Sequence, residues 1–341
     1  MCGIIGVIGK KQAAPRLIDG LRRLEYRGYD SSGIATLVNG EIFRRRAEGK
    51  IDNLAALIKN KSLNGTTGIG HTRWATHGGP TTMNAHPHTD GKVAVVHNGI
   101  IENFLQLRQE LIADGHKFET DTDTEAVVHL ISSLLAKGKS PQVAVTETLK
   151  RLEGAFALAI IFSGLEDFMI GARRGSPLAL GYGDGEMFLG SDGYALAKLT
   201  DQVCYLEEND WVEISAEKAV IRDRFGNKVR RNTCLTELAG DEFSKGNFAH
   251  FMLKEIYEQP SVIGDTLATL VHPTRKSVNL PEFPFLLEMI PRVTIIACGT
   301  SFYAGLVAKY WLEKYARVPV ECDIASEFRY RELEMEPGGL T

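Results

Sequence analysis

The chain has 341 residues, 44% of them hydrophobic, which is enough for about two domains of ~100 to 200 residues each. Its 39 Lys and Arg residues against 43 Asp and Glu residues give a net charge of -4, so a nucleic acid partner is not expected. Its longest apolar runs are far shorter than the ~20 residues of a membrane span, so no membrane partner is expected either.

The start of the sequence and its cysteines indicate a reducing compartment. Residues 4–8 are apolar but contain Gly6, and they lack the positive charge and the small-residue cleavage pattern of a signal peptide. The five cysteines are odd in number, widely spaced and form no CxxC pair, which argues against a disulfide framework and a thiolate zinc site. We therefore expect a cytoplasmic protein with free thiols at Cys2, Cys204, Cys234, Cys298 and Cys322.

In chain order, the first predicted elements are a helix and a hairpin. Leu and Ile at helical spacing predict a helix over residues 15–24. The Asn-Gly pair at residues 39–40 predicts a type I′ turn between strands at 33–38 and 41–46, because both residues accept positive φ angles. The three arginines at 44–46 are then expected on a solvated strand face.

A second helix and a group of strands follow. Thr122 and Glu125 predict a capping box at the start of a helix that continues to residue 135. The close spacing of the strands that come next implies an antiparallel sheet with helices packed outside. These strands are predicted at residues 155–162, 167–172, 178–182 and 186–189.

The character of the sequence changes after residue 237. A polar, glycine-containing stretch at 238–248 is predicted to link a first domain, residues 1–237, to a second domain, residues 249–341. The second domain begins with helical periodicity over 252–270, with an expected break at Pro260. A βαβ order then predicts parallel α/β structure, from a strand at 293–297, a helix at 302–315 and a strand at 318–322.

Cys2 becomes the N-terminal residue if Met1 is removed. Its free α-amino group, with a pKa near ~7.7 to 8.0, can then act as the general base for its own thiol. Gly3 leaves room for a substrate to approach. Taken alone, Cys2 is more simply a small residue that opens a buried strand, so its interpretation depends on the rest of the sequence.

Six short blocks are residues 2–6 (CGIIG), 26–31 (YRGYDS), 70–78 (GHTRWATHG), 84–88 (NAHPH), 96–103 (VHNGIIEN) and 120–125 (TDTDTE). Together, and in this order, they resemble the class II glutamine amidotransferase family over roughly the first two thirds of the chain. The resemblance implies an α+β fold, the four-layer αββα sandwich of the N-terminal-nucleophile proteins, and Cys2 as the nucleophile.

The resemblance also implies how L-glutamine is bound and activated. Arg73 would bind its α-carboxylate and Asp123 its α-ammonium group, which holds the side-chain amide over Cys2. The Asn98 side-chain amide and the Gly99 N–H would form the oxyanion hole. The Asn98-Gly99 pair is also typical of a hairpin turn, and a turn at the rim of the pocket is compatible with both interpretations.

Further residues lie in the same blocks. Those implied to line or close over bound glutamine are Trp74, Thr76, His77 and His86. Those implied to support the nucleophile are Arg27 and Asp30. The five histidines between residues 71 and 97 raise the alternative of a metal site, but no recognised ligand spacing is present and the family needs no metal here, so neither a metal nor another cofactor is expected.

Among these amidotransferases, residues 26–31 and 71–78 are most similar to the glutamine:fructose-6-phosphate aminotransferases. Residues 297–301 (ACGTS) and 325–331 (ASEFRYR) resemble the start of the sugar isomerase (SIS) domain of that group. In this sequence Thr300 and Ser301 are expected at a helix N-terminus, which suits the binding of a sugar phosphate. The resemblance implies that ammonia released from glutamine aminates fructose 6-phosphate to glucosamine 6-phosphate, in a homodimer of the full-length enzyme.

The sequence departs from this group at its C-terminal end. It stops soon after the first βαβ unit, so an incomplete parallel α/β domain is expected, which leaves glutamine hydrolysis as the expected activity of this chain. Two other functions remain open: a stand-alone glutaminase or ammonia-donating part of another class II synthase, and a non-catalytic sugar-phosphate sensor. Release of glutamate from glutamine separates the enzymes from the sensor.

Overall fold

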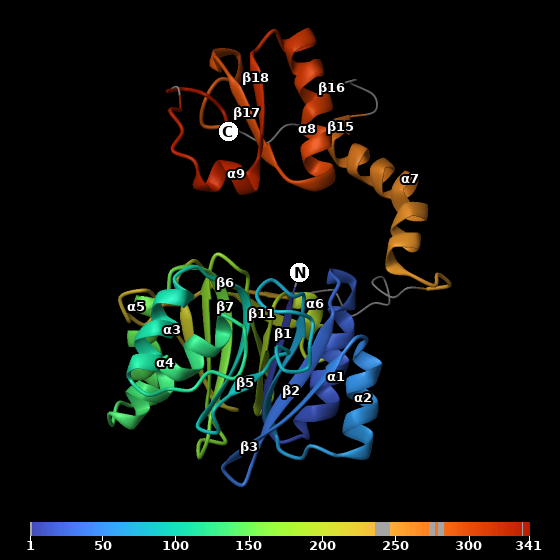
Figure 1. Ribbon diagram of the computed structural model, residues 1–341. Helices are drawn as coiled ribbons and strands as arrows, with labels where there is room; N and C mark the ends of the chain where they lie inside the picture. The colour runs from blue at the N-terminus through green and yellow to red at the C-terminus, as the bar shows by residue number, and fades with distance from the viewer. Residues whose placement is uncertain (1, 236–245, 273–276, 279–282, 336) are drawn as a thin grey trace. The chain divides into compact units, whose positions relative to one another are not determined.

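The chain forms two compact units, Met1–Phe251 and Met252–Thr341. Within the part of the chain that the structure describes, no helix combines the length and apolar character needed to cross a bilayer. The predicted linker at 238–248 lies mostly outside this part. The computed structural model describes residues 2–235, 246–272, 277–278, 283–335 and 337–341 (Figure 1).

The first unit contains an eight-stranded antiparallel sheet in the order β14-β11-β9-β10-β1-β4-β2-β3. Its central strand β1 is fully buried, as its apolar sequence requires. The strands are β1 (Gly3–Ile8), β2 (Ser31–Val38), β3 (Glu41–Glu48), β4 (Thr67–Arg73), β9 (Ala179–Gly183), β10 (Glu186–Gly190), β11 (Gln202–Tyr205) and β14 (Thr233–Leu235).

A second, six-stranded sheet has the order β13-β12-β8-β7-β6-β5 and is also antiparallel. Side chains of the two sheets, among them Ile4, Ile161 and Met169, form one buried cluster between them. The strands are β5 (His88–Thr89), β6 (Val93–Ile101), β7 (Gly154–Phe162), β8 (Met169–Arg174), β12 (Trp211–Ile214) and β13 (Ala219–Arg222).

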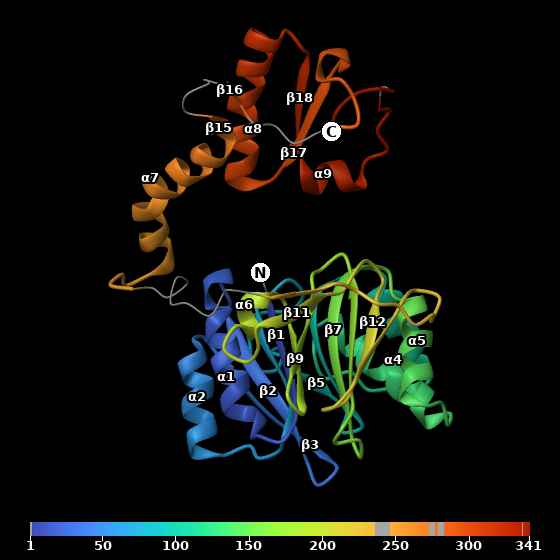
Figure 2. The same cartoon turned by 180° about the vertical axis from the view of Figure 1, so that it is seen from behind.

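Helices cover the outer face of each sheet, and this confirms the predicted four-layer αββα sandwich (Figures 1 and 2). Apolar side chains of α1 and α2 pack on the eight-stranded sheet, and those of α4 and α5 pack on the six-stranded sheet. The helices are α1 (Ala13–Arg23), α2 (Ile51–Asn60), α3 (Phe104–Ala113), α4 (Thr124–Ala136), α5 (Pro141–Arg151) and the short α6 (Gly193–Leu196).

Two local predictions about the first half of the chain have opposite outcomes. The hairpin of β2 and β3 is confirmed, with positive φ angles of 51° at Asn39 and 80° at Gly40. The capping box is wrong, because α4 begins at Thr124 without a side-chain cap. The Glu125 carboxylate instead accepts hydrogen bonds from the N–H groups of Glu119 and Thr120, at 2.7 Å each.

The arginines of β3 do not form a solvated face, as had been expected from the sequence. All three are half-buried. Arg46 donates to the carbonyl oxygens of Met83 and Ala85, at 2.7 and 2.9 Å, and Arg44 donates to the Pro87 carbonyl at 3.3 Å. These bonds hold the segment at residues 83–87 along the edge strand, because an irregular segment needs partners for its carbonyl groups.

The second unit contains the predicted parallel βαβ order, in which β17 pairs with β18 across α8. The expected break at Pro260 is wrong, since α7 is continuous through it. Proline has a helical φ and removes only one helical hydrogen bond. The elements are α7 (Phe251–Leu270), β15 (Val271–His272), β16 (Ser277–Val278), β17 (Val293–Ala297), α8 (Gly299–Trp311), β18 (Val320–Ile324) and α9 (Ala325–Tyr330).

Candidate active site

Cys2 lies directly before β1, which pairs with β10 on one side and with β4 on the other. Its half-buried Sγ accepts a hydrogen bond from the Trp74 N–H at 3.2 Å. A Cβ on Gly3 would lie 2.7 Å from both the Leu24 and the Thr72 side chains, so glycine is required for this close packing.

The thiol of Cys2 needs a base before it can act as a nucleophile. Burial raises its pKa above the ordinary value of 9.0, although the Trp74 hydrogen bond, the positive N-terminus and Arg73 act in the opposite direction. The thiol is therefore protonated at neutral pH. Removal of Met1 places a free amine on the same residue, where it can take up that proton.

Asn98 and Gly99 lie inside β6, so the interpretation of this pair as a hairpin turn is wrong. They pair with Ala157 and Phe156 of β7, and the pairing continues beyond them. Gly99 has a φ of 125°, and a Cβ there would lie 2.0 Å from the carbonyl oxygen of Ala155. Strand pairing thus outweighs the turn preference of Asn-Gly, and only glycine fits at this position.

The side-chain amide of Asn98 is adjacent to Cys2. Its Nδ2 donates to the Cys2 carbonyl oxygen at 3.3 Å and to Ser191 Oγ at 2.9 Å. Its Oδ1 lies 3.0 Å from Nε2 of His71. Asn98 is buried and Gly99 is exposed, so the pair lies at the edge of the protein surface, and one amide N–H of Asn98 bonds to the backbone of Cys2.

The charged residues Arg73 and Asp123 are both buried beside this site. Arg73 ends β4, and its guanidinium donates to the carbonyl oxygens of Gly79 at 2.9 Å, Gly78 at 3.2 Å and His77. Burial lowers its pKa, and the charges of Asp30, Cys2 and Asp123 oppose that shift. The hydrogen bonds of Arg73 thus hold the loop that follows β4. The charged groups of Asp30, Cys2 and Asp123 are close enough to Arg73 to affect its pKa.

Asp123 lies immediately before α4, and its Oδ2 accepts a hydrogen bond from the Ile101 N–H at 2.8 Å. The same oxygen is 3.8 Å from Nδ1 of His97. The carboxylate is therefore hydrogen-bonded to the end of β6, the strand that contains Asn98 and Gly99.

The loop after β4 contains three of the residues expected at the substrate site. Trp74 is 55% exposed, and its ring lies 2.8 Å from the position of a Cβ on Gly28. Thr76 is exposed, and the ring of His77 meets the ring of Phe104 edge to face, with 4.8 Å between centroids. The loop thus presents a large aromatic surface next to Cys2.

His86 is placed differently, in the interior of the first unit. Its Nε2 is 2.8 Å from Thr124 Oγ1, and its ring lies on that of His71, with 4.2 Å between centroids. Burial lowers the pKa of both histidines, that of His71 to about 3. Among the residues that the structure describes, no three His, Cys, Asp or Glu side chains are arranged to bind a metal ion.

Arg27 and Asp30 form hydrogen bonds in the surroundings of Cys2. Arg27 Nη1 donates to the Cys2 carbonyl oxygen at 3.3 Å, and its Nη2 pairs with Asp192. The Asp30 carboxylate accepts a hydrogen bond from the Ala75 N–H at 2.5 Å. Arg27 therefore orients the backbone of Cys2, and Asp30 orients the loop after β4.

Sequence reasoning missed Ser191 and Asp192, which follow β10. Ser191 Oγ accepts hydrogen bonds from the Ile4 N–H at 2.6 Å and from Asn98. Asp192 binds Arg27 and caps α6 through the Ala195 N–H at 2.8 Å. The contacts of Ser191 with Asn98 and of Asp192 with Arg27 each span more than 90 residues of sequence, so no local pattern indicates them.

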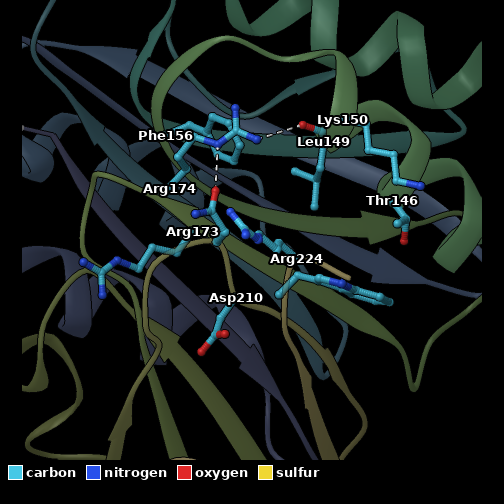
Figure 3. Close-up of a pocket in the computed structure, with 10 residues that line it drawn as sticks. Thr146, Leu149, Lys150, Phe156, Arg173, Arg174, Asp210 and Arg224 are labelled. Carbon is cyan, nitrogen blue, oxygen red and sulfur yellow. Dashed lines mark hydrogen bonds between the residues drawn. The ribbon is translucent and has the colours of Figure 1, made fainter. Parts of the chain in front are cut away.

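A separate pocket lies between α5 and strands β7, β8 and β12 (Figure 3). Two of its basic side chains, Arg173 and Arg174, are engaged within the protein. The Arg174 guanidinium donates to the carbonyl oxygens of Leu152 at 2.6 Å and Leu149 at 3.2 Å, and to Asn209 Oδ1 at 3.0 Å. These bonds cap the end of α5, so Arg174 has a structural role here.

Thr300 and Ser301 occupy the first turn of α8, directly after β17. Both are exposed, and Gly299 before them has a φ of 58°. The strand, glycine and helix N-terminus expected from the sequence are present. The N–H groups of this first turn have no partner within the helix, which is a general property of helix N-termini.

Comparison with known proteins identifies the family. Residues 72–198 match the model of the glutamine amidotransferase domain. Over 341 residues the chain is 57% identical to the "Glutamine--fructose-6-phosphate aminotransferase [isomerizing]" of Zymomonas mobilis subsp. mobilis, in an alignment that covers 100% of this chain and 56% of that protein. The chain therefore contains a glutamine amidotransferase domain.

Two solved structures share much of this fold. The structure of an allosteric regulatory enzyme of purine biosynthesis matches with a TM-score of 0.58 and 27% identity, over 66% of this chain and 50% of that one. The glutamine phosphoribosylpyrophosphate amidotransferase of B. subtilis shares the fold, with a TM-score of 0.58 and 21% identity over 98% of this chain and 71% of that one. This amidotransferase chain spans about half the length of the curated relatives it matches.

Proposed function

We propose that this chain hydrolyses L-glutamine to glutamate and ammonia, with Cys2 as an N-terminal nucleophile. The observation that carries the proposal is the contact between Asn98 of β6 and Cys2, the residue before β1. The side-chain amide of Asn98 donates to the backbone of Cys2, and the exposed Gly99 follows Asn98. A nucleophile, its own amine base and an oriented N–H donor are the parts that acyl transfer needs.

The proposed reaction proceeds through a thioester. The thiol proton of Cys2 passes to the α-amine of the same residue, and Sγ attacks the side-chain amide carbon of glutamine. Asn98 Nδ2 and the Gly99 N–H stabilise the oxyanion, and the amine returns the proton to the leaving ammonia. Water then attacks the thioester, which releases glutamate and regenerates the thiol.

Substrate recognition is proposed to depend on the two buried charges. Arg73 meets the α-carboxylate and Asp123 the α-ammonium group, which fixes the reacting amide over Sγ. Arg73 already donates to carbonyl groups of the loop after β4, so we propose that this loop adjusts as glutamine binds. Trp74, Thr76 and His77 then cover the ligand. The buried His86 contributes indirectly, through its hydrogen bond to Thr124, the residue after Asp123.

For the longer proteins of this group, we propose that the ammonia aminates fructose 6-phosphate to glucosamine 6-phosphate. The 57% identity across the whole chain supports this substrate, since it includes the second unit. In that unit Thr300 and Ser301 would contribute part of a sugar-phosphate site within an SIS-type domain. We also propose a cytoplasmic location and a homodimer of the full-length enzyme.

The test is release of glutamate from L-glutamine by the 341-residue chain. We expect turnover with the protein that lacks Met1 and no turnover with Cys2→Ala, while Cys298→Ala, which removes an exposed thiol of the second unit, retains full activity. Full activity in a folded Cys2→Ala protein would end the proposal. No glutamate from the protein lacking Met1 would instead favour a non-catalytic sensor.

The same assay with fructose 6-phosphate tests the division of labour between the units. We expect glutamate but no glucosamine 6-phosphate, because one βαβ unit offers a sugar phosphate only the groups around Thr300 and Ser301. Stoichiometric amino sugar from this chain would contradict that division.

A further inference from the structure

We propose that His71 is a positioning residue that orients the side-chain amide of Asn98, so that its N–H donor faces the nucleophile. The inference rests on the proposed function of Asn98 in the oxyanion hole. His71 lies on β4 of the eight-stranded sheet and Asn98 on β6 of the six-stranded sheet, so the contact joins the two sheets at the site.

The tautomer of His71 follows from its second partner. Its Nε2 lies 2.8 Å from the carbonyl oxygen of His97 and 3.0 Å from Asn98 Oδ1. A carbonyl oxygen can only accept a hydrogen bond, so Nε2 carries the hydrogen and shares it between the two oxygens. The His97 carbonyl therefore fixes the tautomer of His71.

That tautomer fixes the amide of Asn98. A rotation of the amide by 180° would bring Nδ2 toward the N–H of His71, where two donors would face each other. It would also set Oδ1 against the carbonyl oxygen of Cys2, 3.3 Å away, where Nδ2 now donates. Only the observed orientation satisfies these groups, and it directs the N–H donors of Asn98 toward Cys2 and Ser191.

Burial makes this orientation rigid. His71 and Ser191 have no exposed surface, and Asn98 is 7% exposed, so water does not compete for these hydrogen bonds. Ser191 Oγ holds the Nδ2 end at 2.9 Å and is itself held by the Ile4 N–H. An oxyanion donor that is held in place before the reaction costs no reorganisation when the charge forms.

The experiment compares His71→Leu, which removes the donor, with His71→Gln, whose terminal amide can replace the ring N–H. His88→Leu is the matched control, because His88 is equally buried in the same group of histidines but bonds to Thr122 Oγ1 at 3.2 Å. All three proteins are first compared with the wild type by thermal unfolding.

We expect kcat of His71→Leu for glutamine to fall at least about 10-fold. The upper limit of the decrease is the ~10² to 10³ expected from loss of the Asn98 donor. Its KM should stay within about twofold, His71→Gln should recover part of kcat, and His88→Leu should keep it. Alkylation of Cys2 by iodoacetamide forms no oxyanion, so its rate should be unchanged in His71→Leu. Unchanged kcat in a folded His71→Leu, or equal loss of kcat in His88→Leu, would overturn the proposal.

A readout without turnover separates this proposal from the proposed function. Nitrogen-15 NMR of labelled histidine at pH 7 should show His71 as the neutral tautomer with its hydrogen on Nε2. A hydrogen on Nδ1 would overturn the positioning role even if glutamine is hydrolysed. Absence of hydrolysis with the expected tautomer would refute the proposed function alone.

Discussion

The two units of the chain bury their apolar side chains to very different extents. In the first unit, β7 is buried from Phe156 to Phe162, between the other sheet and the helices. In the second unit, Tyr310 and Trp311 of α8 are 71% and 63% exposed, and among the described residues Val320 is its one buried hydrophobic side chain. The two-stranded sheets of this unit offer too little surface to enclose a core.

This difference in burial explains why the position of Cys2 relative to its neighbours is well defined. Cys2 and Arg73 lie at the ends of strands and Asn98 lies within one, and packing on both faces sets the positions of these strands, so each side chain has its partners in place. Thr300 and Ser301 lie on an exposed helix with few neighbours. Precise chemistry is therefore expected from the first unit, and its substitutions should have the larger effects.

The largest effect is expected from an extension at the N-terminus. One residue retained before Cys2 converts its amine to an amide, which cannot accept the thiol proton, and loss of a general base costs ~10² to 10⁴ in rate. Glutamate release should fall to that extent, whereas the same extension after Thr341 should leave it unchanged. Equal activity of the two extended proteins would remove the amine from the mechanism.

Asn98→Ala should come next, with kcat lowered ~10² to 10³, because one oxyanion donor is lost. Thr300→Ala, in the second unit, should leave glutamine hydrolysis unchanged. Initial rates over a range of glutamine concentrations measure both. A normal kcat in Asn98→Ala would exclude this residue from the oxyanion hole.

A third comparison concerns stability. Ile160 has no exposed surface, so Ile160→Ala should lower the free energy of unfolding of the first unit by about 2 to 5 kcal/mol. Val307 on α8 is 50% exposed, and Val307→Ala should change stability by less than about 0.5 kcal/mol. Urea titration followed by Trp211 fluorescence for the first unit, and by Trp311 for the second, checks both values.

Arg73→Ala and Asp123→Ala should mainly raise KM for glutamine. A charge-assisted hydrogen bond contributes about 1.5 to 3 kcal/mol, which corresponds to ~10- to 150-fold in KM. Arg73→Lys is the control that keeps the charge but loses the paired donors, and it should recover only part of the affinity. Loss of kcat with unchanged KM in both alanine variants would contradict the clamp.

The smallest expected effect is that of pH. The neutral α-amine of Cys2 is the proposed base, and with a pKa of ~7.7 to 8.0 its neutral fraction rises about 4- to 5.5-fold from pH 7 to pH 8. Activity should therefore rise from pH 7 to pH 8 and fall as the amine is protonated. A flat profile of kcat/KM between pH 7 and pH 8 would argue against the amine.

Local sequence patterns were sufficient for much of the fold. The Asn39-Gly40 turn was predicted correctly, since its two strands are neighbours in the sequence and in the sheet. The Asn98-Gly99 pair has the same composition but lies within a strand, because β7 pairs with β6 from far along the chain. Propensity describes one segment, whereas strand pairing depends on a partner that the segment does not contain.

Prediction of the site from local sequence has the same limit. Family resemblance predicted Cys2 and Asn98 as site residues, and the structure places them next to each other. It did not identify Ser191, because a serine after a strand carries no signal until the contact with Asn98, 93 residues away, is known. The position of His86 in the interior was also not visible from the sequence, where it is one of several histidines in polar blocks.

The most direct test of Cys2 as an N-terminal nucleophile is intact-protein mass spectrometry after rapid quenching during turnover of glutamine. We expect a protein that lacks Met1 and carries one γ-glutamyl group on Cys2, with this species decaying as glutamate accumulates. Glutamate release by protein that retains Met1, or a γ-glutamyl group on a residue other than Cys2, would contradict this mechanism.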